Sequence, residues 1–393
     1  MKRLRPNARL GAVVLLIALL SACAEIPDIK PFANATANLA TATDKGYRQT
    51  EAQLAMLQAE NPDLEDQAKK SLNDLRNRWK PTKEAINALV AYTDSLSALA
   101  DAGNTGKEAA NKLTGSFEGL YGAVAQLVPL PGISAGVKTA FDAIGALNGT
   151  IAKMRARNSL RDAAEDAAPA VQVVANVLAE NFVSLEQLSR SAGTAGAAAV
   201  ENKNHGLLDY HQALLENDTR ITKILSLMIR YDGLPNAIRG QAESVRQANA
   251  GGNGDAAARE ILGKLPESQK VVLDQIKAYD PGSPANLQAN DPELVKKLEA
   301  RQKELLVVSN SYRAELKRID PDYQIVAAKI VSIDNATRSG SELFSKSKEA
   351  IKAWAKAHND LKLALEKKQS LSFRELETLV KEIADTFDKG GEK

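Results

Sequence analysis

The chain has 393 residues, with 51 basic and 49 acidic side chains, a formal net charge of +2, and a single cysteine. A charge this close to balance gives no general electrostatic reason to bind nucleic acid, and one cysteine excludes an internal disulfide. Aromatic residues make up only 4% of the chain, whereas the strong helix formers Ala, Leu, Glu, Lys and Gln are plentiful, which favours an all-α fold.

Residues 1–22 have the layout of a secretory signal. Basic residues and no acidic ones occupy the extreme N-terminus, and an apolar run from Leu10 to Leu20 follows. This is the order of a basic n-region and an apolar h-region of about 7–15 residues. The run is shorter than the roughly 20 apolar residues that span a bilayer, so we expect it to be removed rather than to remain as a membrane helix.

The signal ends in the sequence Leu20-Ser21-Ala22-Cys23, which resembles the lipobox of bacterial lipoproteins. The resemblance implies that the signal peptidase recognises Leu20, Ser21 and Ala22, and that Cys23 becomes the lipid-bearing N-terminus, modified by acyl groups such as palmitate. The alternative is an ordinary signal peptide followed by a chance cysteine. Ala24 rather than Asp follows the cysteine. By the same resemblance, this favours anchoring in the periplasmic leaflet of the outer membrane.

We expect the rest of the chain to fall into a lipidated tether (23–43), a main helical bundle (44–250), C-terminal helices (255–388) and a disordered tail (389–393). Residues 33–43 either continue the tether or start a helix. The helices at 255–388 either complete the bundle or form a second domain. The loops at 251–254 and 280–291 are the best candidate seams because they are rich in Gly, Pro, Asn and Asp.

Apolar residues at spacings of three and four predict helices that bury one narrow face. The longest such series runs from Val171 to Ala199, and shorter ones run from Leu207 to Met228 and from Ile351 to Leu365. They predict an elongated all-α multi-helix bundle with coiled-coil-like seams. The expected helices are 44–60, 62–79, 82–101, 106–128, 134–166, 168–203, 206–231, 236–249, 255–263, 266–279, 292–319, 322–368 and one beginning at Ser372.

One segment, residues 119–137, contains no charged residue, and Pro129-Leu130-Pro131-Gly132 turns the chain at its centre. It predicts a helical hairpin tip. The Gly-x-x-x-Gly spacings at 115/119, 132/136 and 145/149 would let neighbouring backbones approach closely. One interpretation is a membrane-active or partner-binding tip, similar in layout to α-helical pore-forming toxins, and the other is a hairpin buried against the bundle. The candidate tip residues are Gly119, Val124, Leu127, Pro129, Leu130, Pro131, Gly132 and Ile133.

The sequence offers no catalytic constellation. His205, His211 and His358 have no metal-ligand spacing, and no nucleotide-binding or nucleophile motif is present. We therefore expect no enzyme activity, no cofactor and no metal. The leading hypothesis is a lipid-anchored periplasmic scaffold that contacts the membrane through Cys23 and binds an envelope protein, and not nucleic acid. The alternative is membrane activity through the 119–137 hairpin.

Overall fold

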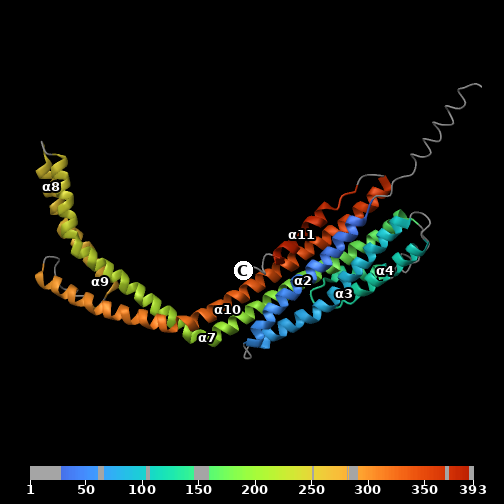
Figure 1. Ribbon diagram of the computed structural model, residues 1–393, viewed down its shortest axis with the longest axis horizontal. Helices are drawn as coiled ribbons and strands as arrows, with labels where there is room; N and C mark the ends of the chain where they lie inside the picture. The colour runs from blue at the N-terminus through green and yellow to red at the C-terminus, as the bar shows by residue number, and fades with distance from the viewer. Residues whose placement is uncertain are drawn as a thin grey trace, which may run out of the picture. The chain divides into compact units, whose positions relative to one another are not determined.

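The computed structural model describes residues 28–60, 66–102, 107–145, 159–249, 252–280, 282, 291–367 and 371–388. This part of the chain is helical throughout and confirms the all-α multi-helix fold (Figure 1). Its helices are α2 (Lys30–Glu60), α3 (Asp66–Ala102), α4 (Lys107–Ala125), α5 (Ala135–Gly145), α7 (Leu160–Ala248), α8 (Gly254–Gly263), α9 (Leu265–Tyr279), α10 (Pro292–Lys367) and α11 (Arg374–Asp388).

The chain divides into two compact units. Unit 1 comprises Met1–Val200 with Lys329–Lys393, and unit 2 comprises Glu201–Ala328. Both boundaries between the units fall inside the long helices α7 and α10. The sequence analysis instead favoured the loops 251–254 and 280–291 as boundaries. Residues 252 and 253 instead form a turn within unit 2. Residues 33–43, assigned to the tether, lie in α2, because Phe32, Leu39 and their neighbours pack into the core of unit 1.

Unit 1 is an up-and-down bundle whose register is fixed by contacts between distant residues. Tyr47 of α2 stacks on Trp79 of α3, with ring centroids 4.2 Å apart. Asn181 of α7 bonds Thr82 of α3, and Thr43 of α2 bonds Ser347 of α10. Each of these helix pairs is antiparallel, as expected for an up-and-down bundle packed around one apolar core.

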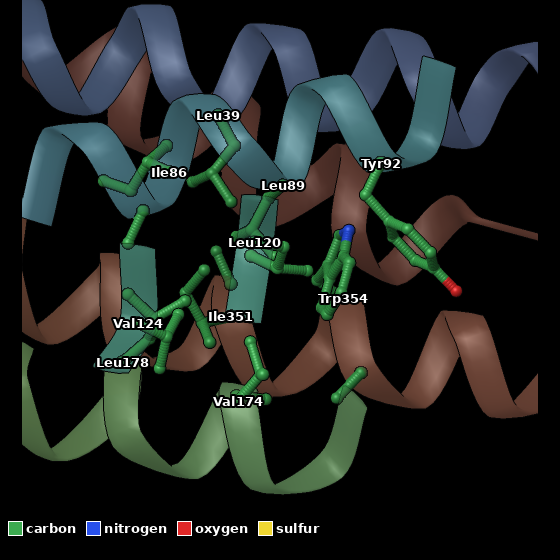
Figure 2. Close-up of a cluster of buried hydrophobic side chains, with 14 of the residues drawn as sticks. Leu39, Ile86, Leu89, Tyr92, Leu120, Val124, Val174, Leu178, Ile351 and Trp354 are labelled. Atoms are coloured by element: carbon green, nitrogen blue, oxygen red, sulfur yellow. The ribbon is translucent and has the colours of Figure 1, made fainter. Parts of the chain in front are cut away.

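The core of unit 1 draws on α2, α3, α4, α7, α10 and α11. Figure 2 shows Leu39, Leu89, Val124, Leu178 and Trp354 converging from five of these helices. The seam predicted from Val171 to Ala199 is confirmed, since its members are buried apart from the partly buried Leu188. The seam predicted from Ile351 to Leu365 is buried as far as Leu361, and Leu365 is partly buried.

Several predicted helix breaks are wrong. Helix α3 continues through Pro81 and α10 through Pro321, while α7 runs unbroken across the expected breaks near 167, 204 and 233. A proline inside a helix removes one backbone hydrogen bond, here the one to the carbonyl oxygen four positions earlier, and Thr82 donates a side-chain bond of 2.7 Å to the next carbonyl oxygen, that of Arg78. Burial of Trp79, Ala85 and Ile86 around this point then favours continuing the helix.

Unit 2 has its own small core. The apolar side chains Ile221, Met228 and Tyr231 of α7 pack with Leu273 and Ile276 of α9 and with residues of α10. Asp218 of α7 accepts bonds from Ser309 and Arg313 of α10, at 2.5 and 3.1 Å. Of the seam predicted at a spacing of seven residues, Leu214, Ile221 and Met228 are buried and Leu207 is partly buried.

Candidate interaction surfaces

No group of three or more potential metal ligands comes together in the described part of the chain. The three histidines lie apart. His205 is exposed, and His211 stacks on Tyr323 with ring centroids 3.6 Å apart. His358 lies in the core of unit 1, where its Nε2 atom is 2.8 Å from the hydroxyl of Tyr92. Burial lowers the pKa of His358 to about 4, so this side chain is a neutral core residue at physiological pH.

The apolar hairpin predicted at 119–137 is present as α4, a turn at 126–134 and α5. Its apolar side chains face the bundle. Val124 and Leu127 are completely buried, and Ile133 is 5% exposed. Leu130 is partly buried against the same core. Among the candidate tip residues only Gly119, Pro129, Pro131 and Gly132 are exposed.

Polar contacts fasten the turn to α3 and α7. The guanidinium of Arg78 donates to the carbonyl oxygen of Pro131 and, at 2.8 Å, to the side chain of Asn181. The backbone and side chain of Ser134 both bond the carboxylate of Glu180, at 2.6 and 2.8 Å. Burial lowers the pKa of Arg78. The sequence analysis missed Arg78, because its partner in the turn is 53 positions away.

The Gly-x-x-x-Gly spacings do not serve the close packing that we expected of them. A side chain added at Gly115, Gly119 or Gly136 would meet no atom within 4 Å. Gly132 differs, because its φ of +87° favours glycine and an added Cβ would lie 2.2 Å from Ser184 Oγ. The third spacing, 145/149, reaches outside the described residues. In unit 1 the close helix approaches are at Gly193, beside Thr337, and at Gly340, beside Ser189.

The buried side chains of the hairpin remove the main reason to regard it as a membrane device. Its uncharged composition is accounted for by packing against α3 and α7. Helix α7 has the one segment in the described residues that is long and apolar enough to cross a membrane by length and composition alone. Of that 18-residue window, 61% is buried inside the structure, so the same explanation applies to it.

Exposed apolar side chains gather in unit 2 instead. All but two of the large exposed apolar residues belong to it: Tyr210, Leu215 and Ile229 on α7, Leu262 on α8, Val271 and Tyr279 on α9, and Val295, Leu306, Val307, Val308 and Ile325 on α10. The run Leu305-Leu306-Val307-Val308 stands out, because only Leu305 is buried while Val307 is 66% exposed. A helix that packs on one side needs no such run.

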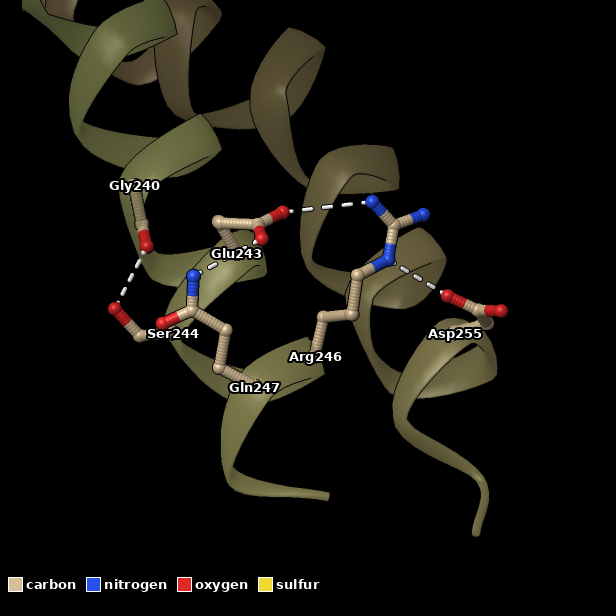
Figure 3. A network of polar contacts seen from close by, with 6 residues as sticks. All are labelled: Gly240, Glu243, Ser244, Arg246, Gln247 and Asp255. Atoms are coloured by element: carbon tan, nitrogen blue, oxygen red, sulfur yellow. Dashed lines mark hydrogen bonds and ion pairs between the residues drawn. The ribbon is translucent and has the colours of Figure 1, made fainter. Parts of the chain in front are cut away.

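Ion pairs join helices within unit 2. Arg246 near the end of α7 donates to Asp255 of α8 at 2.7 Å and to Glu243 at 3.4 Å (Figure 3). The hydrogen bond from Arg246 lowers the pKa of Asp255. Arg301 of α10 makes two bonds of 2.9 Å to the buried Asp280, and these lower the pKa of that carboxyl group. Each of these contacts joins charges of opposite sign within unit 2.

Residues 1–27, with the proposed signal and Cys23, and the tail 389–393 lie outside the described residues. The described part of the chain defines only a structural class. It is a helical-bundle protein whose second unit has exposed apolar side chains. No protein-family model matches the chain, and no curated protein or solved structure is significantly similar to it.

Proposed function

We propose that this protein is a lipid-anchored scaffold of the cell envelope, and that it binds a protein partner through the exposed apolar side chains of unit 2. It acts by binding and not by catalysis. The lipid on Cys23 tethers it to the periplasmic leaflet of the outer membrane, and the helical bundle of unit 1 supports the binding surface.

The exposed run Leu306-Val307-Val308 on α10 is the observation that carries this proposal. These three side chains are 45%, 66% and 38% exposed. Each one leaves apolar area in water that a partner would cover, at about 25 cal/mol per Å². Exposed apolar area is a feature of protein–protein contact sites. Because successive residues of a helix point about 100° apart, these three side chains spread over more than one face of α10.

The charges around this run favour a protein over a membrane or a nucleic acid. Lys303 and Glu304 precede the run, separated from it by the buried Leu305, and Arg301 pairs with Glu304 and Asp280. Membrane-surface helices carry mainly Lys and Arg on their polar face, and nucleic-acid sites carry basic patches. A mixed rim has neither character.

Site-specific photocrosslinking in living cells tests the surface. We would place a photoreactive phenylalanine analogue at Val307 or Ile229 and, as a control, at Ala52, an exposed position of α2 in unit 1. We expect one discrete crosslinked protein of the envelope from each unit 2 position and none from Ala52. Val307→Asp should weaken capture from Ile229 without changing the helical content. The absence of any protein adduct from both unit 2 positions would contradict the proposal.

The anchor has its own test. In cells labelled with a palmitate analogue, the wild-type protein should incorporate label and sediment with the outer membrane. Cys23→Ala should lose the label and no longer be matured at this position. Label that persists in Cys23→Ala would show that the lipid is attached to another residue.

A further inference from the structure

A groove of about 710 Å³ lies between α2 and α11 in unit 1. Phe373 stacks on Phe32 with ring centroids 5.1 Å apart, and Phe387 lies against Gly46 fourteen residues further along both helices. The two helices therefore run parallel. On α2 the walls of the groove extend from Pro31 to Lys45, about 21 Å at the rise of an α-helix.

The lining of the groove suits a long, unbranched apolar ligand. Its floor consists of Ala35, Ala42, Val380, Ala384 and Phe387, all buried or partly buried. Both helices contribute small residues to the floor, Ala35 and Ala42 on α2 and Ala384 on α11, beside the larger Val380 and Phe387. The polar lining residues, such as Asn34, Asn38 and Lys381, are exposed. A ligand on the floor needs no hydrogen bonds, whereas a polar molecule would leave its own groups unpaired there.

The groove begins where the chain enters the bundle. Pro31 lines its first part, and Cys23 precedes Pro31 by only eight positions. Eight residues reach at most about 28 Å when fully extended. Any acyl chain attached to Cys23 is thus confined to a small volume that includes this end of the groove, so its effective concentration there is high.

We propose that the α2/α11 groove binds one acyl chain of the lipid on Cys23 when the protein is away from a membrane. The inference rests on the proposed lipidation of Cys23. The ligand of the groove would then be an acyl group that is covalently attached to the mature protein. Helix α11 would form one wall of the site that binds this acyl group. Shielding one chain from water would keep the lipidated protein monomeric between membranes.

Photocrosslinking from the lipid itself tests this. Cells would be fed a palmitate analogue with a diazirine on the acyl chain. The mass of the intact purified protein would then establish whether Cys23 is acylated. The monomer fraction in detergent-free buffer would then be irradiated and its crosslinked peptides mapped. We expect crosslinks within one chain, from the lipidated N-terminal peptide to residues 31–45 of α2 and 377–387 of α11.

Filling the groove should abolish these crosslinks. Ala384→Phe places a bulky side chain on the floor, and Asn38→Trp, a second variant on the opposite wall, covers the case in which Ala384→Phe does not fold. Ala52→Phe, on the exposed part of α2 outside the groove, is the matched control. We expect a several-fold loss of crosslinks in the groove variants, a loss of monomer, and no change in the control.

The outcomes separate the two ideas. A protein without an acyl group on Cys23 would overturn both the anchor and this inference. An acylated Cys23 whose crosslinks map elsewhere, join two chains, or survive both groove variants would leave the anchor standing and overturn the groove as its binding site.

Discussion

His358 is the buried titratable group with the clearest consequence at the residue scale. Tyr92 supplies the one hydrogen bond to its ring, and its Nδ1 atom has no partner among the described residues. A proton added to the ring would be a charge in the apolar core, with the rings of Tyr92 and Trp354 as aromatic neighbours. Burial therefore lowers the pKa of His358 from 6.5 to about 4.

This shift predicts that unit 1 loses stability in acid. Between pH 6.5 and 4 the unfolded chain binds the proton and the folded chain does not, so the free energy of unfolding falls as the pH falls. The loss at pH 4 is about 3 kcal/mol. Urea unfolding followed by tryptophan fluorescence measures it, since Trp79 and Trp354 both lie in unit 1.

His358→Gln is the control for the pH effect, because an amide can still bond Tyr92 but does not titrate. The variant should be less stable than the wild type at pH 7, and its stability should change much less between pH 6.5 and 4. Parallel pH profiles for the two proteins would mean that other groups cause the acid sensitivity.

Two glycines of the hairpin should respond to alanine with opposite signs. Gly132→Ala puts a Cβ at a positive φ and 2.2 Å from Ser184 Oγ, which we expect to cost about 1–3 kcal/mol. Gly119→Ala adds a Cβ in open space inside α4, which should stabilise the helix by about 0.5–1 kcal/mol. Chemical denaturation of both variants gives the comparison. A stabilising Gly132→Ala would show that the turn is not held in this conformation.

At the scale of helices, substitutions in the hairpin of α4 and α5 distinguish a packed part of the bundle from a membrane-active tip. If the hairpin is a packed part of unit 1, Val124→Glu places a charge in the core and lowers the melting temperature strongly, because Val124 is fully buried. Gly122 lies on a different face of α4, where an added Cβ would meet no atom within 4 Å. Gly122→Glu should therefore leave the melting temperature nearly unchanged. Circular dichroism melts of both variants test this.

The same two variants address membrane activity. We expect no dye release from phosphatidylethanolamine and phosphatidylglycerol vesicles by the wild-type protein or by Gly122→Glu. Release by the wild-type protein that Val124→Glu eliminates, while the variant stays folded, would restore the membrane-active hypothesis.

The seams of unit 1 could be predicted from sequence because they depend on local spacing. The series from Val171 to Ala199 keeps one face of α7 apolar, and burial follows from that regularity. The length of α7 and α10 could not be predicted in the same way. Pro321 and Gly206 argue locally for breaks, because proline and glycine are the weakest helix formers, yet α10 and α7 continue through them. The contact of Arg78 with Pro131 is likewise nonlocal, so nothing in the residues near Arg78 indicates it.

On the scale of the whole molecule, the division into two units makes unit 2 an insertion between two halves of unit 1. The core of unit 1 contains buried residues from both sides of that insertion, such as Leu178 and Trp354, and none from 201–328. Unit 2 draws its core from its own helices. Each unit therefore has the apolar contacts that a cooperative folding unit requires.

This organisation predicts that unit 1 folds without unit 2. In unit 1, α7 and α10 are antiparallel, with Gly193 opposite Thr337, so residues 200 and 329 lie at the same end of the pair and a short helix–helix turn can join them. A variant with 201–328 replaced by such a turn should keep the tryptophan fluorescence of the wild-type protein and the same acid sensitivity from His358. It should also keep lipidation at Cys23. If the shortened protein were unfolded at neutral pH, the two units would fold and unfold as one cooperative unit. Partner binding by unit 2 would then change the free energy of unfolding of the bundle as well.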